Sequence, residues 1–373
     1  MKTITHIFKT YFPDTQGGLE EAIRQIGKHS LKNGYNVNVV SISKDPSELI
    51  LDDIKCHSFK HSFGSDSLPI SVELASNFKE IIRETDILHL HFPYPYGELL
   101  TIFNRVKKPI VITFHCEILN RSLIRLCYEP FARVLLNQAS VIVPTSTNLL
   151  NSTKILQRFK QKTEVINLWL DESRFDNLDI VNEKFQNKVS EYGEFTLFVG
   201  VLRWYKGLDI LLDAAKLING NIVIVGKGPE KERLEKRIND ENISNVYMTG
   251  FLTDSEVIYL LSKCKFTVLP SISPAEAFGQ VLLESCYYSK PMVTTELGTG
   301  TSYVNSDQKT GFVVSPNSSS ELSKAMGKLF ENDELCKTMG DMAYKRYKEN
   351  FSAEVQGDKY IKIYDKLLKG KKM

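Results

Sequence analysis

Short apolar runs alternate with helical patterns along the whole chain, and this alternation is interrupted once, near the middle. Apolar runs of four to eight residues between helical patterns are typical of parallel strands that are buried on both faces. Because consecutive parallel strands need a helical crossover, the pattern predicts α/β layering. At 373 residues the chain is long for a single core, so we expect two domains.

The first series of runs predicts a doubly wound, Rossmann-like domain over residues 1–171. Residues 3–8 are expected to form its opening strand, and Gly34 is expected to follow the first helix as a glycine C-cap. The other strands of this domain are predicted at residues 37–42, 86–92, 109–115, 139–146 and 163–171.

A second Rossmann-like domain is predicted over residues 172–352. Its first part, 172–194, is polar and poor in long apolar runs, as a linker would be. The final helical segment, 353–373, is expected to pack back on the first domain. Two such domains facing each other place a ligand site in the cleft between them, beside the carboxyl ends of strands. The strands of the second domain are predicted at residues 195–202, 221–228, 244–251, 266–272, 291–295 and 311–316.

Composition excludes several classes of protein. The 47 basic and 45 acidic residues give a net charge of +2, and no long basic run is present, so a nucleic-acid partner is not expected. Six cysteines are scattered singly, which indicates reduced thiols and argues against a zinc site. The N-terminal residues are too polar for a signal peptide and no apolar run reaches membrane-spanning length, so a cytoplasmic protein is expected.

Three nucleotide fingerprints are absent from the sequence. There is no G-x-x-x-x-G-K-[ST] and no G-x-G-x-x-G after the first strand, so a P-loop enzyme and a nicotinamide dehydrogenase are poorly supported. No D-x-D occurs either, which argues against a transferase that holds its diphosphate through a carboxylate-bound metal.

Two cations lie in the turn of VGVLRWYKGLDILLDA, between a predicted strand and a helix that begins at Gly207. Arg203 and Lys206 would stand beside free backbone N–H groups at the start of that helix. Fixed charge and N–H groups together suit a diphosphate. For an isolated R-x-x-K, a solvated basic turn is the more common explanation.

The stretch SPAEAFGQVLLES places two carboxylates around the start of another helix. Phe278 and Gly279 precede the helix and Gln280 opens it, so their N–H groups are available to a sugar hydroxyl or a phosphate oxygen. Glu276 would lie at the mouth of this turn, and Glu284 two turns further on an otherwise apolar face. Carboxylates accept hydrogen bonds from vicinal hydroxyls. A surface acid and a helix-dipole acid are the alternative interpretation.

The first domain carries two further candidate sites. His115 ends a predicted strand and would face the cleft, although a lone histidine is more often structural. His89 and His91 alternate on one strand and point to the same face, but no third ligand has convincing spacing, so no metal site is predicted. Gly17 and Gly18 open the first helix and would let a phosphate or a leaving sugar lie against the backbone. A tight strand-to-helix turn would also explain the two glycines.

Taken together, these segments resemble glycosyltransferase family four, a class of retaining enzymes with the GT-B fold. EAFGQVLLE is similar to the family pattern E-x-F-G-x-x-x-x-E, and FVGVLRWYKGLDILLDA is similar to the preceding motif. YFPDTQGGLEEAI, DILHLHFP and VITFHCEI resemble the bacterial polysaccharide mannosyltransferase-like branch. The resemblance extends over nearly the whole chain.

The resemblance implies roles for the candidate residues. Arg203 and Lys206 would neutralise the departing nucleoside diphosphate in place of a metal. Glu276 would bind hydroxyls of the donor sugar, Glu284 the ribose, and His115 the sugar near its reacting carbon. The family often has G-R-L where this chain has GVL, so Arg203 would supply the missing charge from two residues further on. Further donor contacts would come from Gly17, Gly18, Phe278, Gly279 and Gln280.

The activity implied by the resemblance is retaining, metal-independent transfer of a hexose, with mannose favoured, in surface polysaccharide biosynthesis. The donor would be GDP-mannose or a UDP-sugar, the acceptor a glycan or lipid-linked oligosaccharide, and no cofactor is implied. Residues 121–136 and the basic tail suggest peripheral contact with the inner membrane face, although an amphipathic helix packed on its own sheet fits as well. A two-lobed nucleotide-sugar sensor without turnover is the alternative function.

Overall fold

The computed structural model describes residues 1–15, 17–116, 122–175 and 179–370, and it divides into two compact units. The first unit comprises Met1–Trp169 together with the segment that begins at Ala353, and the second comprises Leu170–Ser352. The second unit therefore begins two residues before the predicted boundary at 172.

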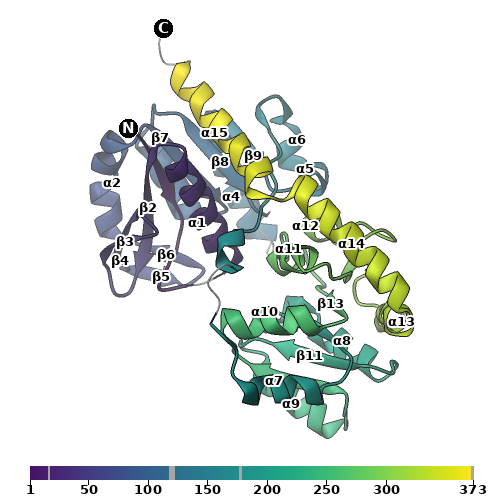
Figure 1. Ribbon diagram of the computed structural model, residues 1–373. Coiled ribbons are helices and arrows are strands. Elements are labelled where there is room, and N and C mark those ends of the chain that lie inside the picture. Colours follow the sequence, from purple (N-terminus) through teal and green to yellow (C-terminus); the bar gives the residue numbers. More distant parts are fainter. Residues whose placement is uncertain (16, 117–121, 176–178, 371–373) are drawn as a thin grey trace. The chain divides into compact units, whose positions relative to one another are not determined.

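A seven-stranded sheet forms the centre of the first unit, in the order β3-β4-β2-β1-β7-β8-β9 (Figure 1). All neighbours are parallel except the edge strand β3, which is antiparallel to β4. The strand order reverses between β1 (Lys2–Ile7) and β7 (Ile87–Phe92). The other strands are β2 (Tyr35–Ser43), β3 (Glu48–Leu51), β4 (Ile54–Lys60), β8 (Ile110–Phe114) and β9 (Val141–Pro144), with a separate hairpin of β5 (Phe63–Ser65) and β6 (Leu68–Ile70).

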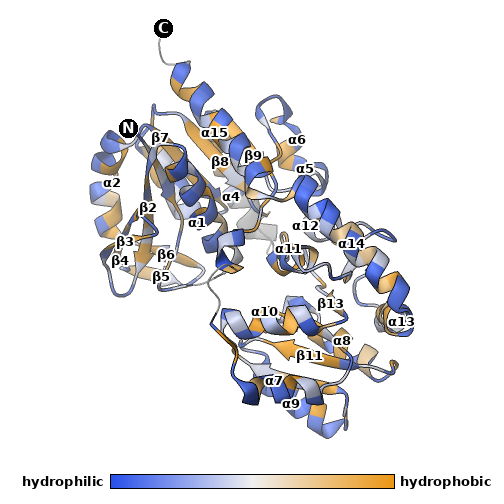
Figure 2. Cartoon of the chain, in the orientation of Figure 1, coloured by the Kyte–Doolittle hydropathy of each residue, from blue (hydrophilic) through white to orange (hydrophobic). Residues whose placement is uncertain are grey.

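The helices of the first unit connect these strands, and their apolar and polar faces are visible in Figure 2. The helices α1, α2 and α4 contribute apolar residues to the two cores described next. They are α1 (Gly18–Lys32), α2 (Val72–Glu84), α3 (Pro95–Phe103), α4 (Ser122–Gln138), α5 (Thr147–Ser152), α6 (Lys154–Gln157) and α15 (Ala353–Lys369).

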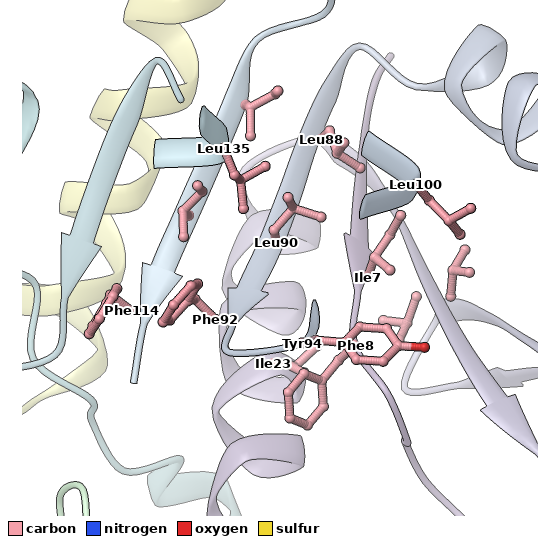
Figure 3. Close-up of a cluster of buried hydrophobic side chains, with 14 of the residues drawn as sticks. Ile7, Phe8, Ile23, Leu88, Leu90, Phe92, Tyr94, Leu100, Phe114 and Leu135 are labelled. Carbon is pink, nitrogen blue, oxygen red and sulfur yellow. The ribbon is translucent and has the colours of Figure 1, made fainter. Parts of the chain in front are cut away.

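The two faces of the first sheet differ in chemistry. Along β7, Leu88, Leu90 and Phe92 point to one side and join a large apolar core with residues of α3 and α4 (Figure 3). Because side chains alternate along a strand, His89 and His91 point to the opposite side. Along this strand one face of the sheet is therefore apolar, and the other includes buried polar rings.

The second face is covered by α1 and by α15, which comes from the far end of the chain. Ile363 of α15 packs in this core with residues of five strands. The Tyr364 hydroxyl lies 2.7 Å from Nδ1 of His89, and the Tyr360 hydroxyl lies 2.8 Å from Oγ1 of Thr113. The last helix thus supplies both the apolar cover of this face and hydrogen-bond partners for its polar groups.

The second unit contains a six-stranded, fully parallel sheet in the order β12-β11-β10-β13-β14-β15. The order reverses between β10 (Phe195–Val199) and β13 (Phe266–Leu269), which makes the sheet doubly wound. Every strand predicted in this half is present. The remaining elements of this unit are α7 (Glu183–Glu191), α8 (Leu208–Ala215), β11 (Asn221–Val225), α9 (Lys231–Asp240), β12 (Val246–Gly250), α10 (Asp254–Lys263), α11 (Gln280–Tyr287), β14 (Met292–Thr295), α12 (Gly300–Val304), β15 (Gly311–Val314), α13 (Ser319–Glu331) and α14 (Asp333–Asn350), with short 3-10 turns at Glu172–Phe175 and Trp204–Lys206. A further 3-10 turn, Lys160–Lys162, belongs to the first unit.

Two predictions about local structure are wrong. Residues 163–171 form no strand, and only Thr163 makes an isolated bridge, to Ile142. The buried Trp169 of this segment packs against helices instead, since its ring lies edge-on to His29 of α1 and also contacts Tyr360 of α15. The predicted linker at 172–194 contains α7, whose Val189 is buried in an apolar core of the second unit.

The contact between Tyr364 and His89 predicts a specific loss of stability. Tyr364→Phe leaves Nδ1 of a fully buried histidine without its hydroxyl partner, which should lower the free energy of unfolding by about 1–3 kcal/mol. Urea denaturation would measure this loss. The same change at the exposed Tyr344 of α14 is the control and should stay within about 0.5 kcal/mol of the parent protein. Equal effects at the two positions would contradict the assignment.

Candidate functional site

Two loops of the second unit meet at the carboxyl edge of its sheet, where the strand order reverses. One loop follows β10 and carries Lys206, and the other follows β13 and carries Glu276. Gly207 has a φ of 69°, and a Cβ atom there would lie 2.0 Å from the carbonyl oxygen of Pro270. Only glycine allows this approach. The carbonyl of Tyr205 then accepts a hydrogen bond from the N–H of Ile272, at 2.8 Å.

This approach places Lys206 and Glu276 in direct contact as an ion pair. Their side chains are only 12% and 9% exposed, so the pair differs from the solvated surface pairs that contribute little. Glu276 also accepts a hydrogen bond from the Ser271 hydroxyl at 3.1 Å, and its backbone carbonyl accepts one from the Thr299 hydroxyl at 2.8 Å. A carboxylate and an ammonium group are therefore held in fixed positions at the strand reversal.

The turn after Glu276 offers hydrogen-bond donors. Gly279 has a φ of 76°, and a Cβ atom there would meet the Leu269 side chain at 2.7 Å, so this position also requires glycine. The backbone N–H groups of Phe278 and Gly279 find no acceptor among the described residues. Gln280 begins α11, and its Nε2 atom is buried without a partner in the described part of the chain. Buried donors without acceptors are expected where a ligand supplies the acceptor.

Glu284 lies about one turn along α11 and contacts a residue that sequence reasoning missed. Its carboxylate lies 3.4 Å from Nη1 of Arg174, whose Nη2 also lies 3.1 Å from Asp254. Arg174 is 110 residues away in the sequence, and nothing in its local pattern indicates this contact. Arg203, by contrast, is exposed and forms no ion pair with any described residue.

In the first unit, His115 directly follows β8 at the carboxyl edge of the sheet. Its ring is buried, with Nε2 3.1 Å from Nδ1 of His91, and no described residue contacts its Nδ1 through a hydrogen bond. Burial lowers the pKa of His115 to about 3, so the ring is neutral near pH 7. The free nitrogen of such a neutral ring can donate or accept a single hydrogen bond with a ligand.

Gly17 and Gly18 lie at the same edge of the first sheet, at the start of α1. Gly17 is the N-cap of the helix, and a Cβ atom there would lie 2.8 Å from Oε2 of Glu20. Glu20 is in turn held by the hydroxyls of Thr10 and Thr15, at 3.0 and 2.8 Å. The turn is therefore tight, and a side chain at position 17 would displace a fixed carboxylate.

The structure adds His6 to the histidines noted in the sequence. In the register of the sheet His6 lies directly opposite His89, and its Nδ1 is 2.9 Å from Nε2 of His91. Ring nitrogens of His6, His89 and His91 lie within 4.8 Å of one another. Strand parity puts His6 on this face, but only the register between β1 and β7 reveals the contact.

The structure thus brings Lys206 and Glu276 together, with Phe278, Gly279 and Gln280 in the same turn. His115, Gly17 and Gly18 belong to the other unit and share the carboxyl edge of its sheet. A polar hollow of about 600 Å³ in the second unit lies at the opposite, amino edge, where Asn221 begins β11. That hollow contains none of the predicted site residues.

Known proteins resemble the chain over its full length. The model of Glycosyltransferase Family 4 matches residues 16–174, and that of Glycosyl transferases group 1 matches residues 179–346. O-antigen chain mannosyltransferase C of Escherichia coli is 34% identical over 99% of both chains. D-rhamnosyltransferase WbpZ of Pseudomonas aeruginosa is 33% identical over 94% of this chain and 92% of its own.

Solved structures show the same fold. Sucrose-phosphate synthase of Thermosynechococcus elongatus superimposes with a TM-score of 0.80 at 18% identity, covering 99% of this chain and 100% of its own. Anabaena HepE in complex with UDP-glucose gives a TM-score of 0.76 at 18% identity, covering 98% and 100%. The prediction of a GT-B fold with two Rossmann-like domains is confirmed.

The first unit also contains a buried acid, Glu98, near the start of α3 and close to the carboxyl edge of the sheet. The Glu98 carboxylate accepts hydrogen bonds from the N–H of Tyr94, at 2.7 Å, and from the hydroxyl of Tyr128 in α4. Burial raises the pKa of Glu98 to about 7, although the two hydrogen bonds act in the opposite direction. Glu98 therefore links α3 to α4, and its burial favours the protonated carboxyl in the folded protein.

The raised pKa of Glu98 predicts a pH-dependent stability. The folded carboxyl keeps its proton up to about pH 7, whereas the unfolded one loses it near 4.5, so its contribution is complete below pH 4.5 and is lost as the pH rises through 7. The loss amounts to about 3 kcal/mol. Glu98→Gln should remove this dependence in urea denaturation series between pH 4.5 and 8, whereas Glu80→Gln at an exposed site should not. An unchanged profile in Glu98→Gln would refute the assignment.

Proposed function

Because this chain belongs to glycosyltransferase family four, we propose that it transfers a hexose, with mannose favoured, from a nucleotide sugar to a glycan or lipid-linked oligosaccharide of a surface polysaccharide. The observation that carries the proposal is the buried pair of Lys206 and Glu276 at the strand reversal of the second sheet, the usual place for a nucleotide in such sheets. The names of two full-length relatives support the sugar, since D-rhamnose is 6-deoxymannose and shares the configuration of mannose.

In this proposal the cations act on the leaving group. Negative charge develops on the nucleoside diphosphate as its bond to the sugar breaks, and Lys206 and Arg203 stabilise that charge in place of a metal. Lys206 is already held in position by Glu276, so little reorganisation is needed when the donor binds. Arg203 is exposed and takes its position only with the donor.

The hydroxyl groups of the donor sugar contact the acidic residues and the free backbone N–H groups. Glu276 accepts hydrogen bonds from the sugar, and Phe278 and Gly279 offer their backbone N–H groups to the sugar or the phosphate. Glu284 accepts from the ribose, with Arg174 fixing its carboxylate. The free Nδ1 of His115 contacts the sugar near its reacting carbon.

The reaction we propose retains the anomeric configuration. The departing phosphate accepts the proton of the acceptor hydroxyl on the face from which the phosphate leaves, so no protein nucleophile is required. Gly17 and Gly18 let the diphosphate approach the backbone at the start of α1. No cofactor takes part.

GDP-mannose is the favoured donor, and UDP-sugars are the alternative. Resemblance to the mannosyltransferase-like branch supports the first, and the complexes of HepE with UDP and UDP-glucose support the second. In this proposal the protein meets its acceptor at the inner membrane face. Phe131 and Val134, which α4 exposes, would contact the membrane there. Arg121 and residues 371–373, which suggested this contact, lie outside the described residues. Within the described part of the chain no helix has the length and apolar character of a membrane span.

Removal of Lys206 should separate its catalytic role from its structural one. Lys206→Ala should lower kcat by about 10²–10³-fold, the size of effect seen when one stabilising group is removed. It should also lower the melting temperature, because Glu276 keeps a buried charge without a partner. The double variant Lys206→Ala/Glu276→Gln removes that charge, so it should regain stability but not turnover.

The matched control is Lys216→Ala, which removes a lysine from the amino edge of the same sheet and should leave kcat unchanged. Near-parental turnover in Lys206→Ala, or recovery of turnover in the double variant, would refute the leaving-group role.

A panel of sugar nucleotides tests the function itself. A ligand that binds only the folded protein raises its melting temperature, so GDP-mannose, GDP-D-rhamnose and UDP-glucose should be compared with GDP and UDP in thermal-shift and transfer assays. We expect the largest shift and measurable hydrolysis or transfer with GDP-mannose. Saturable binding without hydrolysis or transfer would indicate a sensor. Absence of binding by all five would refute a nucleotide-sugar site.

A further inference from the structure

Three buried histidine rings form a line across neighbouring strands of the first sheet. Nε2 of His115, after β8, lies 3.1 Å from Nδ1 of His91 on β7, and Nε2 of His91 lies 2.9 Å from Nδ1 of His6 on β1. The two outer nitrogens, Nδ1 of His115 and Nε2 of His6, have no partner among the described residues. The line therefore has two free ends and two ring-to-ring hydrogen bonds, and it lies where the strand order reverses.

All three rings are uncharged near pH 7. Each is at most 1% exposed, and burial lowers the pKa of His6 and of His115 to about 3. Burial and the neighbouring rings lower the pKa of His91 well below its ordinary value. A neutral imidazole has one N–H donor and one nitrogen lone pair, so each ring can donate on only one side.

This restriction leaves two arrangements of the line. If His115 donates from Nε2, then Nδ1 of His91 must accept, His91 must donate from Nε2, and His6 must accept at Nδ1. All three rings are then protonated on Nε2. If the line runs the other way, all three are protonated on Nδ1. A mixture of tautomers would place two lone pairs or two N–H groups against each other at 3.1 or 2.9 Å, inside a buried site.

We propose that His6 and His91 are positioning residues for His115, which fix its ring and couple its tautomer to theirs through this line of hydrogen bonds. The inference rests on the proposed function, in which Nδ1 of His115 meets the donor sugar. Both arrangements leave one N–H and one lone pair at the free ends, so the hydrogen-bond count alone does not choose between them. Because a sugar hydroxyl can donate or accept, the direction of the hydrogen bond that it forms with Nδ1 of His115 is coupled to the tautomer of all three rings.

His89 supports the line without belonging to it. Its ring stacks on that of His91 with centroids 4.7 Å apart, and both of its nitrogens have hydroxyl partners, Tyr364 at 2.7 Å and Thr113 at 2.8 Å. This use of both nitrogens also argues against a metal held by His6, His89 and His91. No carboxylate among the described residues hydrogen-bonds to these rings, so a buried divalent cation would keep its full charge.

Nitrogen NMR tests the coupling directly and needs no substrate. The chain has seven histidines, so selective ¹⁵N-histidine labelling gives a simple spectrum in which the protonated and lone-pair nitrogens of each ring are distinguished. We expect neutral rings at positions 6, 91 and 115, all in the same tautomer or averaged to the same extent. Different tautomers within the line, a cationic ring, or stoichiometric zinc in the purified protein would overturn the proposal.

Amide substitutions at His91 test the positioning role. The side-chain amide of Asn lies two bonds from Cβ, as Nδ1 does, and that of Gln lies three bonds away, as Nε2 does. His91→Asn therefore keeps a partner for His115 and loses His6, whereas His91→Gln keeps His6 and loses His115. We expect kcat/KM to be about tenfold higher in His91→Asn than in His91→Gln, the worth of about one buried hydrogen bond. Equal values, or the reverse order, would overturn the positioning role.

A second pair of variants keeps the test decisive if a His91 variant does not fold. His6→Asn keeps a partner for Nε2 of His91, and His6→Leu removes it. His91 and His115 should share a tautomer in both variants, and divergence of the two rings in either would overturn the coupling. His89→Gln, equally buried but outside the line, is the control for general loss of packing and should leave the shared tautomer intact.

The two proposals fail in different ways. If the His115→Ala variant turns over normally while the three rings of the parent protein share a tautomer, the proposed role of His115 in the reaction is wrong. His6 and His91 then position no reacting group. If His115→Ala is inactive while the rings differ in tautomer, the proposed function stands and this inference is refuted.

Discussion

Parallel strands that are covered on both faces impose one constraint on everything else in this protein. Their carboxyl ends all emerge at one edge, and the loops at the reversal of the strand order form the usual ligand site of such a sheet. In the second sheet the reversal lies between β10 and β13, whose loops carry Lys206 and Glu276. In the first sheet it lies between β1 and β7, which carry His6 and His91. In both sheets the candidate site residues thus lie at the reversal of the strand order.

The two reversals keep buried polar groups in different ways. Lys206 and Glu276 neutralise each other, and Ser271 satisfies a further acceptor site of the carboxylate. The histidines of the first sheet avoid charge altogether, because burial holds their rings neutral and each ring is hydrogen-bonded to another ring or to a hydroxyl. Both solutions are specific in geometry, since a buried polar group without its partner is costly. This requirement explains why glycine at position 207 must let two backbone segments approach so closely.

Much of this arrangement is predictable from sequence, and the exceptions have physical causes. The strands of the second domain were predicted because each is an apolar run bounded by turn residues. Apolar content reports burial rather than pairing, however, so residues 163–171 were predicted as a strand although only Thr163 makes a bridge and Trp169 is buried against helices. The edge strand β3 and its neighbour β4 were missed because exposed polar residues interrupt their apolar pattern.

The candidate site shows the same limit. Motifs named Lys206 and Glu276 separately, but their contact spans 70 residues and depends on the loops that Gly207 brings together. Arg174 and His6 were missed for a similar reason, since their partners are fixed by tertiary packing and by strand register. Residue identity therefore predicted which groups take part, and only the fold showed which of them touch.

The position of α15 has a consequence for the order in which the chain acquires its structure. The helix that covers the histidine face of the first sheet is encoded after the whole of the second unit. During synthesis, Leu170–Ser352 can leave the ribosome and fold as a complete unit while the apolar residues and the histidines of that face still lack the cover of α15. The half of the protein that is translated first is thus the half that is finished last.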